Sequence, residues 1–528
     1  MPFKDSNAQE VDEKLAALIT NSNAIRAVAA AVEGTIGPKG LDIMLVDRFG
    51  EVTITNDGVT ILKQMDVNHP AAKMLINIAK AQQEEVGDGT TTATIMAGAM
   101  VSEGVAQILR GVPVARIIEG IKYGVKRAQE ILNSFTIPAS GIDDPALKKI
   151  ALIAGREHED IAELVFEAGK LSGHEKLSEE NFKLKDVIIS RVGADNEVFM
   201  GIIIDKEKLN KQMPKELTDV RVLLIDDALE PEQLAPEALR TEAGFARYLE
   251  LKEEFKKNIQ KIIDLKINLV LVDKNISDEA EEMLTDAGVM VLERVSRQDI
   301  EKVSEHTGAR IIKRTGLNRS SEEISSYIGR AERVYEDEKL KQIRLVGGKA
   351  KPIATILVGA ATQEIVGERE RIAKDAASSL QAAFLKGMVP GGGAVEIAVS
   401  RELEKERSKI KGMAAYGLDC VISALKAPFA QIANNAGFNP LEKMEEVIYS
   451  QTQNNSHSLG INCENGQLAD MLELGVLDPV LVKLHAIKAA GEVAEAILRI
   501  NTIIKKKDEQ VPSRKGGHES PGIGEMDF

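Results

Sequence analysis

Residues 87 to 92, which read Gly-Asp-Gly-Thr-Thr-Thr, restrict the structure of this 528-residue chain more than any other segment. They run directly into an apolar, helix-forming segment, residues 93 to 109. The first N–H groups of a helix have no partner within the helix, and glycines let the backbone approach a bulky anion. The positive helix end favours phosphate, and Asp88 adds a hard oxygen ligand suited to Mg²⁺. The segment predicts a phosphate-binding loop, although a Gly-Asp turn that merely caps a helix explains it equally well.

A second group of turn residues lies upstream of this loop. Residues 35 to 40, Thr-Ile-Gly-Pro-Lys-Gly, follow a helical pattern, and two alternating runs, 42–46 and 52–55, then predict a β-hairpin. The second run leads into Asn-Asp-Gly at 56–58. Gly-Pro is ordinary helix-stopping chemistry and Asn-Asp-Gly is an ordinary turn, so each motif is weak alone. Their conjunction is what indicates a binding site.

Three further features occur towards the other end of the chain. Residues 368 to 385 predict a helix in which Asp375 lies beside an apolar stripe. The triple glycine at 391–393 precedes another helix, as in a flexible joint or a close backbone approach to a ligand. Leu-Asp-Pro at 477–479 then begins the last long helix. Because phosphate-type motifs lie at both ends, the middle must be an insertion into one nucleotide-binding domain.

The central part of the chain differs in character from its helix-rich ends. Strand-like runs alternate there with helical stretches, which is the pattern of an α/β layer. The predicted strands are 186–192, 198–204, 220–226, 268–273, 289–293 and 309–313, and the predicted helices include 237–263, 278–287 and 298–306. The length of the chain is enough for about three domains.

Six features of the sequence resemble the ATP-site motifs of chaperonins, the Cpn60/TCP-1 family, and they occur in the same order along the chain. They are the motifs at 35–40, 56–58 and 87–92, Asp375, the glycines at 391–393, and Asp478. The resemblance covers nearly the whole chain, up to a tail near Lys505. It implies an ATPase, a chaperonin that closes over non-native polypeptides in a double ring and promotes their folding.

The fold implied by this resemblance is multidomain, α and α/β. It comprises a helical equatorial ATP-binding domain built from both chain ends, a small α/β intermediate domain, and an α/β apical domain with a helical protrusion. The implied limits are 1–137 and 391–505 for the equatorial domain, 138–205 and 355–390 for the intermediate domain, 206–354 for the apical domain, and 506–528 for a flexible tail.

The resemblance also implies roles for individual residues. Asp88 would hold Mg²⁺, Asp57 would orient water or the γ-phosphate, and Asp375, on a different domain, would position or activate the water. Gly392 and Asp478 would contact adenosine, and backbone N–H groups would hold the phosphates. The implied ATP-binding set is Thr35, Gly37, Pro38, Asp57, Gly58, Gly87, Asp88, Gly89, Thr90, Thr91, Thr92, Gly391, Gly392 and Asp478.

One position departs from the family pattern. Members with a built-in lid often have Gly-Lys in an intermediate-domain loop that senses the γ-phosphate. The matching place here reads Gly155-Arg156-Glu157. Because arginine is also a good phosphate partner, Arg156 is a candidate γ-phosphate sensor.

The run from about 229 to 255 separates two groups of chaperonins. It lies where the group without a separate lid protein (archaeal, eukaryotic-cytosolic and a few archaeal-like bacterial members) has a helical protrusion. The resemblance therefore implies a group II, thermosome-like member with a built-in lid and no lid co-chaperonin, although a charge-rich helix is usually an ordinary surface helix. Phe245, Tyr248 and Phe255 would meet neighbouring protrusions when the ring closes.

Ring assembly is implied in the same way. The hairpin at 42–55 would pair with a neighbour's terminal strands, one of them 501–504. Symmetry then gives closed rings, two of them stacked, with about eight subunits each in this family.

Composition restricts the remaining partners and the location. The net charge of −15 disfavours nucleic acid as a main partner. No apolar run approaches the roughly 18 residues of a membrane helix, and the polar N-terminus shows no signal peptide. Two cysteines argue against a disulfide framework, and the seven histidines show no metal-ligand spacing. These features predict a cytoplasmic protein that binds neither nucleic acid nor membrane.

Two other classes stay open at this point. A metabolic ATP-dependent enzyme, such as a small-molecule kinase, would need a second substrate pocket with specific polar residues, and the sequence shows none. A chaperonin that depends on a co-chaperonin would lack the run from 230 to 263.

Overall fold

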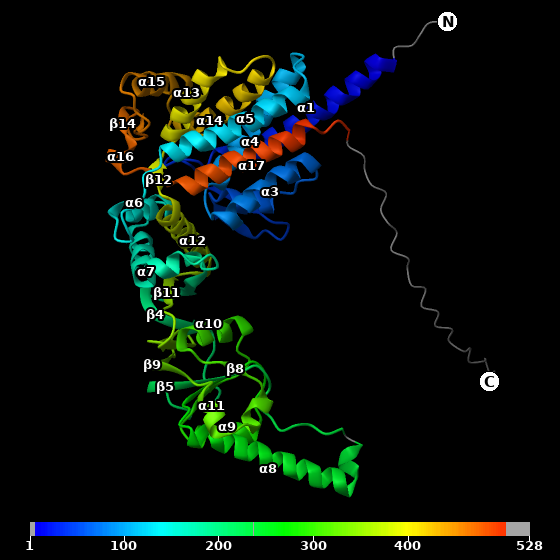
Figure 1. Cartoon of the computed structure of the whole chain (residues 1–528), viewed down its shortest axis with the longest axis vertical. Helices are drawn as coiled ribbons and strands as arrows, with labels where there is room; N and C mark the ends of the chain where they lie inside the picture. Colours follow the sequence, from blue (N-terminus) through cyan, green and yellow to red (C-terminus); the bar gives the residue numbers. More distant parts are fainter. Residues whose placement is uncertain (1–5, 236, 503–528) are drawn as a thin grey trace, which may run out of the picture.

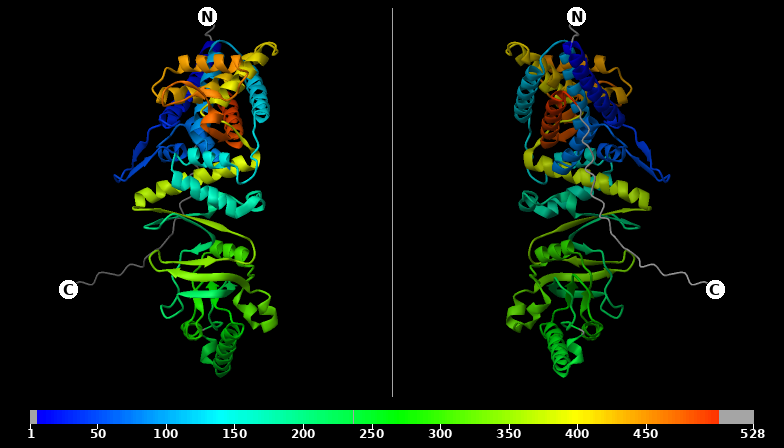
Figure 2. Two further views of the ribbon diagram at one scale, coloured as in Figure 1. Left: turned by 90° about the vertical axis from the view of Figure 1, so that its left-hand side faces the viewer. Right: turned by 90° about the vertical axis from the view of Figure 1, so that its right-hand side faces the viewer.

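Three bodies follow one another along the long axis of this computed structural model, which describes residues 6–235 and 237–502 (Figure 1). A block of helices at one end contains both the first and the last described segments. A middle body connects this block to an outer body built on a sheet, from which one long helix projects. The side views in Figure 2 show the same order.

The first body, the helical block, is built from both ends of the chain. Its helices are α1 (Ser6–Glu33), α2 (Gly58–Gln64), α3 (Pro70–Glu85), α4 (Thr90–Leu109), α5 (Val114–Ser134), α13 (Ala394–Arg407), α14 (Ala414–Asn435), α15 (Pro440–Gln453), α16 (Met471–Leu474) and α17 (Val480–Leu498). Its short strands are β1 (Ile43–Val46), β2 (Val52–Thr55), β12 (Met388–Pro390), β13 (Leu459–Ile461), β14 (Leu468–Asp470) and β15 (Leu477–Pro479). One core joins side chains from 18–132 with side chains from 389–498, so the central part of the sequence is an insertion into this block.

The central helix α4 explains why the two chain ends stay together. Ala93, Met96, Ala97, Met100 and Val101 recur at helical spacing and are buried against α1, α14 and α17. By length and composition alone, this 20-residue helix is apolar enough to cross a membrane, so the expectation that no apolar run reaches that length was wrong. It is a core helix here, because 61% of its apolar window is buried inside the protein.

The middle body packs a long helix against part of the sheet. It contains α6 (Pro145–Ala154), α7 (Glu159–Leu177), η1 (Leu184–Val187), β3 (Ile188–Val192), β4 (Glu197–Ile204), β11 (Ala354–Ala360) and α12 (Gln363–Lys386). The strand predicted at 186–192 begins only at Ile188, because the preceding turn is a 3₁₀-helix. Ile372, Ala376 and Leu380 of α12 are buried against α6 and α7. This stripe holds α12 rigidly within the middle body.

The outer body completes a nine-stranded sheet that begins in the middle body. It contains β5 (Glu216–Ile225), η2 (Ala238–Arg240), α8 (Glu242–Asp264), β6 (Leu269–Val272), α9 (Asp278–Asp286), β7 (Met290–Leu292), α10 (Arg297–Thr307), β8 (Ile311–Ile312), η3 (Arg314–Asn318), α11 (Ser321–Ser325), β9 (Gly329–Asp337) and β10 (Gln342–Val346). The strand order is β3-β11-β4-β10-β9-β5-β6-β7, and β8 pairs with β5. Strands β5, β6 and β7 are parallel and fully apolar at their paired residues, as expected of an α/β layer.

The projecting helix α8 is divided into two parts by burial. Leu251 and Phe255 are buried in the core of the outer body, whereas Phe245 and Leu249 are exposed. The expectation that Phe255 meets neighbouring protrusions was therefore wrong, because this ring is already packed within its own domain. The part of the protrusion with free apolar side chains ends before Leu251.

The predicted hairpin at 42–55 is confirmed as β1 and β2, paired antiparallel. It stands out from the side of the helical block (Figure 2). Met44 faces Ile54 across the strands and Val46 faces Val52, and all four are more than half exposed. Such an apolar face on a two-stranded edge is unusual for a monomer. Of its predicted partner strand, 501–504, residues 503 and 504 lie outside the described residues, as does the predicted tail.

A small antiparallel sheet joins the helical block to the middle body. α12 ends at Gly387 and continues into β12, which pairs with β15 so that Val389 faces Asp478. Ile137 bridges Met388 at the same junction. Asp478 therefore lies on a strand and α17 begins only at Val480, which corrects the prediction that residues 477–479 start the last helix. Backbone pairing with a distant segment decides this conformation.

Candidate nucleotide-binding site

A pocket of about 440 Å³ lies between the helical block and the middle body. It brings together most of the residues predicted for the ATP site. Those that line it are Thr35, Gly37, Pro38, Asp57, Gly58, Asp88, Gly89, Thr90, Thr91, Thr92, Arg156, Asp375, Gly392 and Asp478. They come from loops, helices and a strand that are far apart in the sequence.

Two predicted residues, Gly87 and Gly391, do not line the pocket. Gly87 has a φ of +76°, and a Cβ atom there would lie 2.5 Å from Cβ of Ser378 on α12. A Cβ atom on Gly391 would lie 3.1 Å from the carboxyl carbon of Asp478. These two glycines therefore allow the close packing behind the pocket rather than contact with a ligand.

The start of α4 forms an anion cradle on the pocket wall. Gly89 is the N-cap residue with a φ of +74°, and no side chain in the described part of the chain caps this helix end. The N–H groups of the first turn, at Thr90, Thr91 and Thr92, are therefore available to a ligand. A Cβ atom on Gly89 would lie 2.4 Å from Val482, so only glycine fits this turn.

Asp88 lies beside this cradle with its carboxylate held on both oxygens. Its Oδ1 accepts a hydrogen bond from the Gly89 N–H at 2.6 Å, and its Oδ2 accepts one from the Ser379 hydroxyl at 2.7 Å. Burial raises the pKa of Asp88, against the effect of the Ser379 hydrogen bond, and the charge of Asp478 raises it further. A buried carboxylate of this kind is stabilised in its charged form by a nearby cation, which compensates for the lost hydration water.

Asp57 lines the pocket from the helical block, and Asp375 lines it from the middle body. Asp57 is the N-cap of α2, and its Oδ2 accepts hydrogen bonds from the N–H and hydroxyl of Thr60 at 3.0 and 2.6 Å. Asp375 is carried by α12, and Gln83 lies 3.4 Å from its Oδ1. Burial raises the pKa of Asp375 well above its usual value, and the charges of Asp57 and Asp88 raise it further. A carboxylate with a raised pKa accepts a proton more readily.

Arg156 also lines this pocket. Its backbone has a φ of +52° and Glu157 one of +62°, both uncommon for residues other than glycine. Its guanidinium pairs with Glu368 and lies 4.0 Å from Oδ2 of Asp375. The loop therefore turns sharply and directs a positive charge towards the helix that carries Asp375.

Comparison with known proteins identifies the family. Residues 28–508 match the model of the TCP-1/cpn60 chaperonin family. The chain belongs to the TCP-1/cpn60 chaperonin family. It is 37% identical to thermosome subunit beta of Archaeoglobus fulgidus over 96% of this chain and 94% of that protein. It is 35% identical to the thermosome subunit of Pyrococcus horikoshii over 96% and 95% of the two chains.

A solved chaperonin shares the whole architecture. The crystal structure of a group III chaperonin in the open state matches with a TM-score of 0.86 and 45% identity, over 94% of this chain and 100% of that one. The predicted multidomain fold is thereby confirmed. ATP-dependent folding of proteins, with ATP hydrolysis, is the function of this chaperonin, and the small-molecule kinase interpretation is excluded.

The chaperonin pocket also contains two charged residues that the sequence analysis missed. Lys483 lies 2.5 Å from Oε1 of Glu396 and 2.7 Å from Oδ2 of Asp478. Burial alone would lower the pKa of Lys483, but the two carboxylates outweigh it and raise the pKa. Glu396 Oε2 is buried without a hydrogen-bond partner among the described residues. The sequence signal that could have revealed Lys483 was its position five residues after Asp478, one turn into the following helix.

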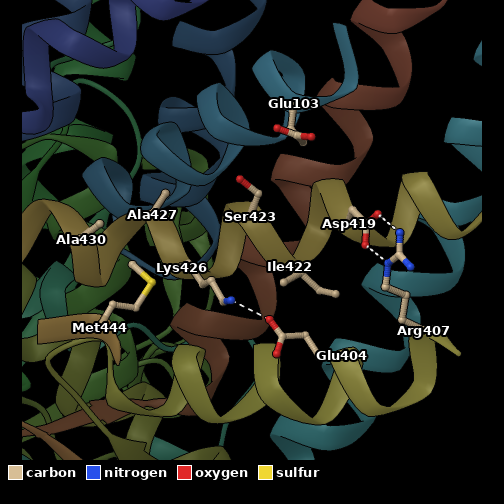
Figure 3. A pocket seen from close by; sticks show the side chains of 10 residues that line it. All are labelled: Glu103, Glu404, Arg407, Asp419, Ile422, Ser423, Lys426, Ala427, Ala430 and Met444. Atoms are coloured by element: carbon tan, nitrogen blue, oxygen red, sulfur yellow. Dashed lines mark hydrogen bonds and ion pairs between the residues drawn. The ribbon is translucent and has the colours of Figure 1, made fainter. Parts of the chain in front are cut away.

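A larger hollow of about 620 Å³ lies on the outer surface of the chaperonin's helical block, along α14 (Figure 3). Four of its charged side chains form ion pairs, Lys426 with Glu404 at 2.6 Å and Arg407 with Asp419, and the Glu103 carboxylate accepts a hydrogen bond from Gln107. It contains neither a glycine-rich turn nor a helix N-terminus among its lining residues. It therefore lacks the features that bind phosphate, in spite of its size.

Proposed function

We propose that this chaperonin binds Mg²⁺-ATP in the pocket between the helical block and the middle body, with the predicted residues that line this pocket in the roles described above. The decisive observation is the meeting of three groups in one pocket: the anion cradle of α4, the carboxylates of Asp57 and Asp88, and Asp375 from the other body. A phosphate chain fits the cradle, and Asp375 faces its end.

The residues present fit a magnesium ion. Mg²⁺ usually takes one or two carboxylates together with phosphate oxygens, and it neutralises charge on the transferred phosphoryl group. Asp88 supplies a hard oxygen beside the cradle, on the wall of the same pocket. Among the described residues there is no cluster of three or more acidic, His or Cys ligands, which suits a metal shared with the nucleotide.

The other predicted residues have separate roles in nucleotide binding and hydrolysis. The first-turn N–H groups of α4 hold the phosphates, and Arg156 contacts the γ-phosphate. Asp57 orients the water from one side, while Asp375 accepts its proton from the other. Asp478, held by Lys483, accepts from the ribose hydroxyls, and the unpartnered Glu396 oxygen is close by. Because Asp375 belongs to the middle body, hydrolysis depends on how that body sits against the helical block.

Replacement of Asp88 by asparagine tests this site directly. The variant is expected to lose at least about tenfold in Mg²⁺-dependent affinity for a non-hydrolysable ATP analogue, because the amide removes the charged metal ligand but keeps the shape. Calorimetric titrations with and without Mg²⁺ measure this loss. An unchanged Mg²⁺ dependence would mean that Asp88 serves only the helix turn.

We further propose two stacked rings of about eight subunits, with the hairpin β1–β2 pairing with a neighbour. The exposed apolar face of Met44, Val46, Val52 and Ile54 supports this contact. The domain limits given above, non-native polypeptides as clients, closure by a built-in lid without a co-chaperonin, and a cytoplasmic location belong to the same proposal. Electron microscopy with and without ATP, and cell fractionation, test these points.

The hairpin contact gives a second prediction. In a double variant, Met44→Lys with Ile54→Glu, the new charges face each other across the strands, so the hairpin itself keeps a favourable pair. The apolar face needed by the neighbour is lost, and light scattering should show subunits that no longer assemble. Leu249→Glu, an exposed substitution on α8, is the control and should leave rings intact. Rings of normal mass in the double variant would exclude this contact.

A further inference from the structure

We infer that Ser379 is a positioning residue for ATP hydrolysis, whose hydroxyl orients the Asp88 carboxylate across the junction between the middle body and the helical block. This role presupposes that Asp88 binds Mg²⁺ as proposed above. With this role of Ser379, helix α12 has a second function besides carrying Asp375. The metal ligand of one body is then in its working orientation only while the other body lies against it.

The geometry around Asp88 shows what the serine does. Ser379 is completely buried, and its Oγ donates to Oδ2 of Asp88 at 2.7 Å. The other oxygen accepts from Gly89 N–H at 2.6 Å. A carboxylate has about four lone-pair positions, so the hydrogen bonds found in the described residues leave roughly half of them for a cation. With both oxygens held, the carboxylate cannot rotate away from the pocket that it lines.

The backbone of this loop is held separately, from within the helical block. The buried Gln82 donates through Nε2 to the carbonyl oxygen of Asp88 at 2.9 Å and to that of Val482 at 3.2 Å. The hydrogen bonds of Gln82 therefore hold the Asp88 backbone independently of the Ser379 hydrogen bond. Among the described residues, the side-chain hydrogen bond that reaches the Asp88 carboxylate from another body is the one from Ser379. Loss of this bond should affect carboxylate orientation while the loop backbone stays in place.

The neighbouring serine shows that the contact is not a general property of helix serines. Ser378 Oγ donates to the carbonyl oxygen of Lys374 on its own helix at 2.8 Å, which is the usual arrangement for a serine inside a helix. Ser379 instead donates across the junction. Ser378 therefore provides a matched control, with the same residue type, the same helix and the adjacent position.

The position of Ser379 on α12 links it to the water-positioning carboxylate. Asp375 and Ser379 are four residues apart, so they lie on one face of the helix, one turn from each other. Because Ile372, Ala376 and Leu380 of α12 are buried in the core of the middle body, we expect α12 to move together with that body. Closure of this body would bring both groups to the pocket together, and opening would remove both.

The test uses the assembled full-length protein and a non-hydrolysable ATP analogue, so that binding is measured without turnover. Ser379→Ala is expected to raise the Mg²⁺ concentration for half-maximal analogue binding about tenfold, as for other groups that orient a metal ligand. Binding in EDTA should be unchanged, and Ser378→Ala should match the wild type in both conditions. In the Asp88→Asn background, Ser379→Ala should have no further effect, because the two residues act as one unit.

Two results would overturn the inference. One is a Mg²⁺ dependence in Ser379→Ala equal to that of Ser378→Ala. The other is an equal loss of analogue binding with and without Mg²⁺, which indicates a packing role for Ser379. The outcome for Asp88→Asn alone shows whether only the role of Ser379 fails or whether the proposed metal site fails as well. If that variant shifts the Mg²⁺ dependence and Ser379→Ala does not, only the role of Ser379 fails. If neither shifts it, the proposed metal site fails as well.

Discussion

Asp375→Ala is expected to reduce ATP turnover by about 10²-fold or more while leaving ATP binding nearly intact. The phosphate cradle, Asp57 and Asp88 belong to the helical block, so they remain when the Asp375 carboxylate is removed. The carboxylate lies in the pocket with its pKa raised well above the usual value by burial and by Asp57 and Asp88. A group in that state suits proton acceptance from water but adds little to the affinity for a polyanion.

Turnover at saturating ATP and calorimetric affinity for ATP measure the two halves of this prediction. Glu370→Gln is the matched control, because Glu370 is on the same helix but pairs with Lys374 and Ser190 outside the pocket. It should keep wild-type turnover. Turnover within about a factor of two of wild type in Asp375→Ala would exclude the assignment. An equal loss of binding and turnover would instead indicate a structural role.

Replacement of residues 231–250 by a short Gly/Ser linker should abolish protected enclosure of a client while ring assembly and ATP hydrolysis continue. The structure sets these limits. Leu229 is buried and bridges Ile276, and Leu251 and Phe255 are packed in the outer body, so a longer deletion would damage its core. Phe245 and Leu249, within the removed segment, are exposed in the single subunit and need partners elsewhere. Neighbouring protrusions in a closed ring would supply them.

Protease sensitivity of a bound client, with an ATP transition-state mimic present, measures enclosure. The double variant Phe245→Ser with Leu249→Ser should reproduce much of the loss. Arg247→Ala, between them on the exposed surface, should not, because its ion pair with Glu250 is solvent-exposed and contributes little. A deletion variant that shields its client as well as the intact protein does would mean that α8 is an ordinary surface helix.

Local sequence rules predicted most of the individual elements. The hairpin at 42–55, the helix following Gly89 and the helix ending at Gly387 are all present. Glycine conformation, helix capping and alternation of apolar residues act between near neighbours, so the sequence carries them directly. The errors concern burial and long-range pairing. Phe255 is a core residue, residues 477–479 form a strand, and α4 is long and apolar enough to pass for a membrane helix.

By itself, the sequence predicted a phosphate-binding loop at residues 87–92 and a nucleotide-binding domain split between the chain ends, and it indicated the family. Only the tertiary structure decided which of these residues share a pocket and what holds them there. The hydrogen bond from Ser379 to Asp88 and the ion pairs of Lys483 with Glu396 and Asp478 join segments far apart in the chain. Such contacts depend on how whole helices pack, and no short-range pattern records that packing.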